Sequence, residues 1–147
     1  MPTHGSYKYS DGSEYTGEWN DDGKRHGLGY MTFSDGSSYD GRFENGLCNG
    51  YGVMMFLDKS RYQGEFTSGK FHGLGIFQRS DGMMFEGEFQ DGKINGLGVV
   101  TYADGTHGLP RNEGVFKEHR FVRQDTCPLV IQKATQAAQS AFAQKLT

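Results

Sequence analysis

The chain has 147 residues and a formal net charge of −3, which suits a single domain and gives no strong field for nucleic acid or anionic lipid. Glycine supplies 23 residues, more than double its usual share of about 7%, and aromatic residues supply 14%. Disordered glycine-rich chains are poor in Tyr, Phe and Trp. We therefore expect an ordered chain up to Asp125.

The two cysteines, Cys48 and Cys127, lie far apart in unlike contexts. This spacing suits neither a metal site nor a disulfide framework, so we expect reduced thiols, no metal and no cofactor. The first residues lack an apolar signal core, and no stretch approaches the roughly 18 apolar residues of a membrane span. These features predict a soluble cytoplasmic protein.

An aromatic residue followed two positions later by glycine opens a motif that recurs four times. The copies begin 24, 23 and 23 residues apart, and such a period is the mark of a repeat architecture. The copies are Tyr15-Thr-Gly17-Glu18-Trp19, Tyr39-Asp-Gly41-Arg42-Phe43, Tyr62-Gln-Gly64-Glu65-Phe66 and Phe85-Glu-Gly87-Glu88-Phe89.

A second motif follows each copy of the first, so each repeat is predicted to contain two strands. Its copies are His26-Gly27-Leu-Gly29, Asn49-Gly50-Tyr-Gly52, His72-Gly73-Leu-Gly75 and Asn95-Gly96-Leu-Gly98. We predict a repeat array over residues 1–123, with four full repeats at 15–107 and half repeats at 5–14 and 112–120.

Short connections join the predicted strands. Asp-Gly readily adopts the positive φ of tight hairpin turns, and successive units are joined at Asp11-Gly12, Asp35-Gly36, Asp81-Gly82 and Asp104-Gly105. Consecutive strands must then be antiparallel neighbours. About ten strands at about 4.8 Å spacing predict a mostly β, elongated single-layer antiparallel sheet on the order of 45 Å long.

Alternation along each strand places the aromatic residues and the glycines on one face of this sheet. Because a glycine leaves room for a ring to lie on the backbone, we expect a thin core of ring-on-glycine contacts. The other face mixes polar residues with apolar ones such as Leu28, Leu74 and Leu97. One layer cannot cover both faces.

The repeats stop after Phe121, and Thr126-Cys127-Pro128 has the features of a helix start. The following residues are good helix formers with an apolar stripe at helical spacing. We predict a C-terminal α-helix and tail over 124–147. We favour a helix that caps the array, and a helix that recruits a partner is the alternative.

The repeat resembles the MORN motif, which runs Tyr-x-Gly-Glu-Trp/Phe, then Gly-Lys, then His/Asn-Gly-x-Gly, then Asp-Gly. The resemblance covers residues 5 to about 116 and implies a ladder of β-hairpins with a grooved surface. Three departures from the motif are expected to loosen the strand register locally. They are Asp58-Lys59 in place of Asp-Gly, Arg79 in place of an aromatic residue, and one extra residue within Asn20-Asp21-Asp22.

Within that family the chain is similar to a group of small animal proteins. The N-terminal half repeat, the link from His107 to Gly114 and the C-terminal helix carry this likeness. It implies an adaptor that binds the tail of a class III unconventional myosin. It also implies a place in actin-rich projections such as filopodia, stereocilia and photoreceptor microvilli or rhabdomeres.

Catalytic chemistry finds little support in the repeated residues. The Gly27-x-Gly29 pattern lacks the third glycine of a dinucleotide fingerprint. His26 and His72 are roughly 19 Å apart if each repeat advances two strands, too far to share a metal. Repeat-spaced glutamates are likewise too far apart to act as a carboxylate pair. We therefore expect no enzyme.

The aromatic face is the predicted binding site, because a single sheet leaves an apolar trough exposed. We expect it to hold a peptide segment, with the glutamates selecting a basic partner. The candidates are Trp19, Phe33, Tyr39, Phe43, Phe56, Tyr62, Phe66, Phe85, Phe89 and Tyr102, together with Glu18, Glu65 and Glu88.

A column of lysines at Lys24, Lys70 and Lys93 supports an alternative function, a module that binds phosphoinositides at a membrane surface. The wide spacing of these lysines favours a solvated edge instead. We expect a monomer, although exposed sheet edges can pair.

Overall fold

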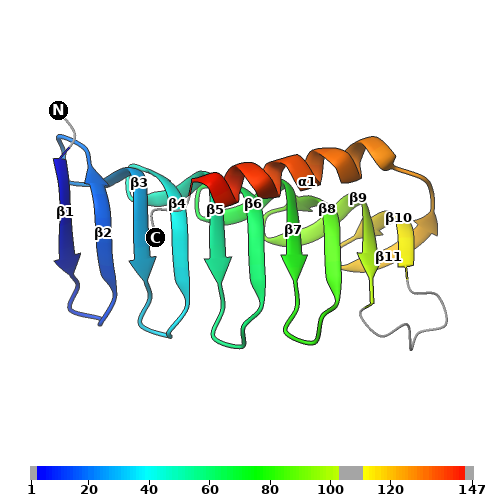
Figure 1. Cartoon of the computed structure of the whole chain (residues 1–147), viewed down its shortest axis with the longest axis horizontal. Helices are drawn as coiled ribbons and strands as arrows, with labels where there is room; N and C mark the ends of the chain where they lie inside the picture. Colours follow the sequence, from blue (N-terminus) through cyan, green and yellow to red (C-terminus); the bar gives the residue numbers. More distant parts are fainter. Residues whose placement is uncertain (1–2, 103–110, 145–147) are drawn as a thin grey trace.

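Eleven strands form one antiparallel sheet in which every strand pairs with its neighbours in the sequence (Figure 1). The computed structural model describes residues 3–102 and 111–144. The strands are β1 (Thr3–Lys8), β2 (Glu14–Trp19), β3 (Arg25–Thr32), β4 (Ser38–Glu44), β5 (Leu47–Met55), β6 (Arg61–Thr67), β7 (Lys70–Gln78), β8 (Met84–Gln90), β9 (Lys93–Thr101), β10 (Arg111–Lys117) and β11 (Arg120–Gln124).

This architecture confirms the predicted fold class, an open antiparallel sheet with a C-terminal helix. Strand β11 was not predicted, since the sequence after the last recognisable half repeat carries neither motif. The predicted turn at Asp104-Gly105 lies outside the described residues. The strand pairs joined by the turns at Lys59 and Arg79 show no register shift, so the expectation of local loosening there was wrong.

A row of paired glycines crosses the sheet, one from each of the first ten strands. Each glycine stands opposite the next across the strand boundary, so the backbones of neighbouring strands are bare along this line. The row, here called the glycine ladder, consists of Gly5, Gly17, Gly29, Gly41, Gly52, Gly64, Gly75, Gly87, Gly98 and Gly114.

One ring in each repeat lies over this bare backbone. The Tyr62 ring covers Gly75 so closely that a Cβ there would overlap its hydroxyl and ring carbons. The Tyr62 hydroxyl donates a hydrogen bond to the Glu65 carbonyl, at 2.9 Å. Tyr39 makes the same bond to the Arg42 carbonyl, at 2.8 Å. The ring-on-glycine contact predicted from the sequence is therefore present, and its polar end is satisfied.

The covering rings alternate along the sheet with a second aromatic ring of the first motif. Neighbouring rings meet edge to face with centroids 4.9 to 5.2 Å apart, the geometry that the ring quadrupole favours. This row of rings is here called the ring ladder. In spatial order its members are Tyr15, Phe43, Tyr39, Phe66, Tyr62, Phe89, Phe85 and Phe116.

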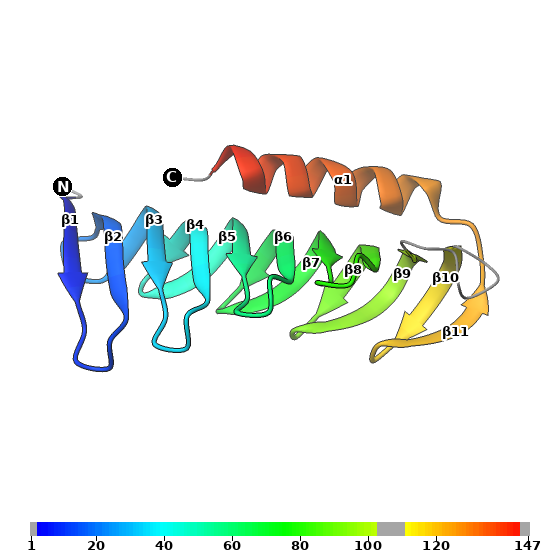
Figure 2. The ribbon, with the colours of Figure 1, turned by 60° about the horizontal axis from the view of Figure 1, so that its bottom comes forward.

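Irregular pairing beside the glycine ladder bends the strands. Within each full repeat the register shifts between the glycine and the aromatic residue two positions later, as at Gly64 and Phe66. Such bulges bend a strand and increase its twist. Phe56, which follows β5, and Phe71, near the start of β7, then meet across the aromatic face with centroids 6.0 Å apart. The aromatic face is therefore the concave side of the ribbon (Figure 2).

Helix α1 (Pro128–Ala143) runs lengthwise over β5 to β9 on the face opposite the ring ladder (Figures 1 and 2). Its small buried side chains let it approach the sheet closely, where Val99 is fully covered. The Cys127 amide donates to the Glu113 carboxylate at 2.8 Å, which fixes the start of the helix. The buried residues on α1 are Ala134, Ala137, Ala138 and Ala141.

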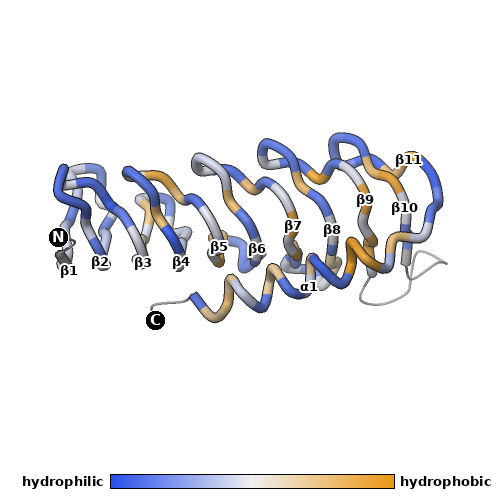
Figure 3. The backbone as a smooth tube through the Cα atoms, turned by 90° about the horizontal axis from the view of Figure 1, so that it is seen from above, coloured by the Kyte–Doolittle hydropathy of each residue, from blue (hydrophilic) through white to orange (hydrophobic). Residues whose placement is uncertain are grey.

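In each described turn between repeats an Asp carboxylate accepts a hydrogen bond from the backbone amide two residues on, and most hairpin tips are hydrophilic (Figure 3). The Asp35 carboxylate accepts hydrogen bonds from the hydroxyl and the amide of Ser37 at 2.6 and 2.9 Å. These bonds hold the pKa of Asp35 below its usual value. Among the described residues, no helix combines the length and apolar character needed to cross a bilayer.

We predict that Gly75→Ala strongly destabilises the protein, because the new methyl group would displace the Tyr62 ring from the core. A loss of about 3 kcal/mol is expected for such overpacking, measured by denaturant unfolding. Gly5→Ala is the matched control, since a Cβ at Gly5 would meet only the Trp19 indole nitrogen at 3.8 Å. Equal losses for the two variants would contradict the ring-on-glycine account.

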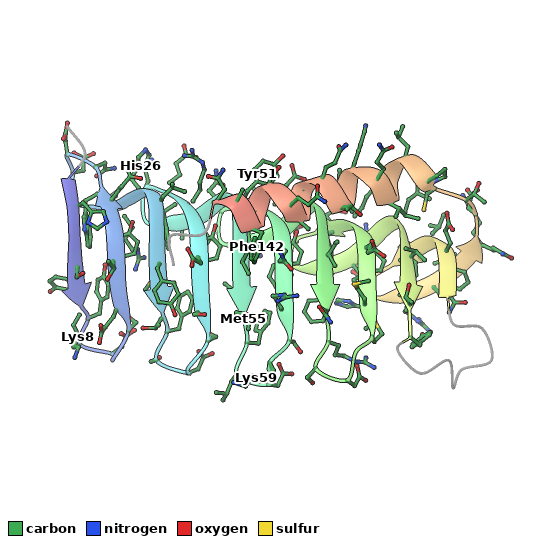
Figure 4. All side chains as sticks on the ribbon, in the orientation of Figure 1. Lys8, His26, Tyr51, Met55, Lys59 and Phe142 are labelled. Carbon is green, nitrogen blue, oxygen red and sulfur yellow. The ribbon has the colours of Figure 1, made fainter. Side chains whose placement is uncertain are left out.

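We predict that Lys59→Gly stabilises the fold by about 1 kcal/mol, because Lys59 has a left-handed backbone that L side chains disfavour. Lys59 lies at the tip of the β5–β6 hairpin (Figure 4) with φ of 76°. Its counterpart Gly36 has φ of 93°. The reverse change, Gly36→Lys, should destabilise the fold by a similar free energy, and the thermal midpoints of the two variants measure both effects. A lower midpoint for Lys59→Gly would contradict this prediction.

Candidate binding groove

The ring ladder forms the floor of the concave face and is itself buried. Six of the predicted binding residues belong to it, and each is 5% exposed or less. Their rings contact one another and the glycine backbone, so they offer little surface to a ligand. These six are Tyr39, Phe43, Tyr62, Phe66, Phe85 and Phe89.

Four other predicted residues, Trp19, Phe33, Phe56 and Tyr102, are partly exposed at the edges of this floor. The Trp19 indole N–H donates to the Gly5 carbonyl at 3.0 Å, so its polar group is already satisfied. Phe33 and Phe56 line one hollow of the concave face, and Tyr102 lines another. Of the predicted aromatic set, these three give the groove its accessible surface.

The groove contains two hollows that draw side chains from both ends of the strands. One has a volume of about 560 Å³ and the other of about 460 Å³. The larger is lined by Arg25, Met31, Phe33, Phe43, Leu47, Cys48, Met54 and Phe56, among others. The second is lined by Phe71, Phe77, Arg79, Met83, Ile94, Val100, Tyr102, Phe116 and Phe121, among others.

Several residues that line the groove were not among the predicted binding residues, which came from the first motif and from the position that follows the second strand of a repeat. Met31, Met54, Phe77 and Val100 each lie two positions after the last glycine of the second motif. The same alternation that places this glycine on the aromatic face also places these residues there. The signal that could have found them was therefore present in the sequence.

The charged side chains that line the groove already have partners, and its cysteine is buried. The Arg25 guanidinium donates to the Gly46 carbonyl at 2.7 Å and lies over the Tyr9 ring at 5.4 Å, a cation–π contact. Arg79 forms a salt bridge with Asp81 at 2.7 Å. Burial raises the pKa of the Cys48 thiol to about 12, so this cysteine stays protonated and is a poor nucleophile.

The repeated glutamates lie on the face opposite the groove and bind the backbone. The Glu18 carboxylate accepts a hydrogen bond from the Leu28 amide at 2.8 Å. Glu65 accepts from the Leu74 amide at 2.5 Å, and Glu88 binds Leu97 in the same way. Each amide lies on the strand opposite the bulge, where the ladder of backbone hydrogen bonds is interrupted. This geometry gives the glutamates a structural role outside the groove.

The first residue of the second motif links successive repeats. The His26 imidazole accepts a hydrogen bond from the Asn45 amide in the next repeat at 3.3 Å. The Asn49 side chain accepts in the same way from Ser68, at 3.0 Å. Within residues 3–102 and 111–144, no three His, Cys, Asp or Glu side chains gather as they would around a metal ion.

The hairpin ladder, its glycine-backed rings and its open groove define a repeat protein built from one short unit. The MORN repeat family matches the chain at residues 15–38, 39–61, 62–84 and 85–107, which are the four predicted repeats. The chain therefore belongs to the MORN-repeat family. It is 64% identical over 140 residues to the MORN repeat-containing protein 4 homolog of Drosophila melanogaster, covering 95% of this chain and 71% of that relative.

We predict that Glu65→Ala lowers stability by about 1 to 2 kcal/mol, because the Leu74 amide loses its acceptor in a partly buried site. Glu65→Gln keeps an acceptor oxygen and should lose less. The measurement is the denaturant midpoint. Glu14→Ala is the control, since the exposed Glu14 carboxylate meets only Lys8, at 3.3 Å. The structural role would be refuted by equal midpoints for Glu65→Ala and Glu14→Ala.

Proposed function

We propose that this protein is a non-catalytic adaptor whose groove binds a peptide segment from the tail of a class III unconventional myosin. The observation that carries the proposal is the row of partly exposed apolar side chains around the two hollows of the concave face. Contiguous exposed apolar surface on a folded protein usually marks a binding site. The choice of myosin rests on the resemblance to small animal MORN-repeat adaptors.

The shape of the groove suits a polypeptide segment. It runs along the sheet, across the strands, and both of its walls supply apolar side chains. A flexible tail segment loses conformational freedom when it binds, so its affinity should depend on a few buried anchors. Such binding would place the adaptor in the actin-rich projections where these motors act, including filopodia, stereocilia and photoreceptor microvilli.

The lysine column gives less support to the membrane alternative. Lys93 lies 3.6 Å from the Glu118 carboxylate, which offsets its charge. The equivalent position in the second repeat is Leu47, so the column is interrupted. A membrane surface is best bound by a cluster of basic residues, and this edge offers spaced ones. The groove therefore supports protein binding better than membrane binding.

We predict that Phe33→Ala combined with Phe77→Ala weakens binding of a class III myosin tail segment at least about tenfold, since each change removes an apolar contact in one hollow. Isothermal titration calorimetry measures the affinity, and circular dichroism checks the fold. Residues of the ring ladder are unsuitable for this test, because truncating them would also lower stability.

The control combines Leu129→Ala with Phe142→Ala, two helix residues that are 61% and 57% exposed on the opposite side of the sheet from the groove. This variant should bind as the wild type does. If the helix variant lost binding while the groove variant kept it, the partner would attach to the helix and the groove proposal would fail.

A further inference from the structure

Equivalent positions on the two walls of the groove face each other across the ring ladder. The near wall consists of the first inward residue after each turn within a repeat. The far wall consists of the residue that directly follows the second strand of each unit. Each near-wall residue faces the far-wall residue of the preceding unit. The facing pairs are Arg25 with Tyr9, Cys48 with Phe33, Phe71 with Phe56, and Ile94 with Arg79.

The walls touch at two of these four pairs. The Arg25 guanidinium lies over the Tyr9 ring at 5.4 Å. The Phe71 and Phe56 rings meet edge to face at 6.0 Å, and Phe71 also stacks on Tyr62 at 4.2 Å. Long side chains on the near wall therefore bridge the groove at alternate repeats.

The walls stay apart at the other two pairs, because Cys48 and Ile94 are shorter. The hollow beside Cys48, here called the first chamber, has a volume of about 560 Å³. The hollow beside Ile94, the second chamber, has a volume of about 460 Å³. The Phe56–Phe71 bridge separates them. The groove is thus two apolar chambers with a constriction between them.

The spacing of the chambers limits the conformation of a ligand that fills both. Cys48 and Ile94 are two repeats apart, which is four strands or about 19 Å. A ligand must cross above the Phe56–Phe71 contact, where a helix about 10 Å wide would be held away from the floors of both chambers. An extended chain advances about 3.3 Å per residue, so about six residues span the distance.

Charge distinguishes the first chamber from the second. The Arg25 guanidinium, on the near wall of the first chamber, donates to the neutral Gly46 carbonyl and to the Met31 sulfur at 3.2 Å. Asp35, on the far side of this chamber, is engaged by Ser37. Arg79 in the second chamber is already paired with Asp81. A ligand carboxylate would therefore be attracted to the near wall of the first chamber.

We propose that the partner segment binds in an extended form with two apolar anchors about six residues apart, one in each chamber. Small side chains cross the Phe56–Phe71 bridge, and an acidic residue accompanies the first-chamber anchor beside Arg25. The inference rests on the proposed function for its myosin partner, but the spacing rule follows from the shape of the groove.

The test fills each chamber separately. Cys48 and Ile94 are the equivalents of Phe71 in the neighbouring repeats. Cys48→Phe therefore places a phenyl ring in the first chamber, and Ile94→Phe places one in the second. Met55→Phe, on the opposite face of β5, is the matched control, and thermal midpoints verify folding. The probes are a class III myosin tail segment and peptides selected from a displayed random library long enough to span both chambers.

Peptides selected on the wild type should carry two apolar positions about six residues apart. Cys48→Phe should lower the affinity for these peptides about tenfold, and replacing the first anchor with alanine should then have no further effect. Ile94→Phe should behave in the same way toward the second anchor. Deleting three of the peptide residues between the two anchors, the linker, should reduce affinity to that of a peptide with a single anchor. Phe71→Ile, which opens the bridge, should relax the spacing.

The inference would be overturned if the selected peptides carried a single apolar cluster, or if deleting linker residues left their affinity unchanged. It would also be overturned if Cys48→Phe and Ile94→Phe both acted on the same anchor. Failure of the myosin segment to bind the wild type would remove the proposed function alone. The selected peptides would then still decide whether the two-anchor rule holds.

Discussion

The contact between an aromatic ring and a pair of facing glycines supports the whole structure. Tyr62 shows its parts: the ring lies on Gly75, and its hydroxyl returns to the Glu65 carbonyl. Burial raises the pKa of Tyr62 well above its usual value, so the hydroxyl remains a donor. This contact gives a single sheet an apolar core without a second layer, because each ring is covered by backbone below and by neighbouring rings at its edges.

The same contact divides the residues by role. Rings that recur at the same place in every repeat are buried in the floor of the groove and stabilise the fold. Positions that vary between repeats, such as Cys48, Phe71 and Ile94, shape the open surface above that floor. In the proposed function, recognition would therefore depend on what differs from one unit to the next, while the shared motif maintains the scaffold.

Periodicity was enough to predict the repeats, the antiparallel meander and the division of residues between faces. It could not predict which rings are exposed, because that depends on the bend at each bulge, and bulges bring Phe56 and Phe71 together from opposite strand ends. The role of Glu65 was missed for the same reason, since the amide that it binds lies at the bulge. Strand β11 carries neither motif and is held by its backbone pairing with β10 and by the Phe121 ring against Phe116, which the repeat period does not reveal.

The partial cover that α1 provides gives the ribbon two mechanically different halves. Helix α1 packs across β5 to β9 on their outer side and links them. Strands β1 to β4 are joined chiefly through their own hydrogen bonds and rings. The twist of an open sheet accumulates from strand to strand, so a change in that twist coils the sheet about its long axis. Such coiling would be resisted least in the strands that the helix does not cover, so the proposed groove would be stiffer beside β5 to β9 than beside β1 to β4.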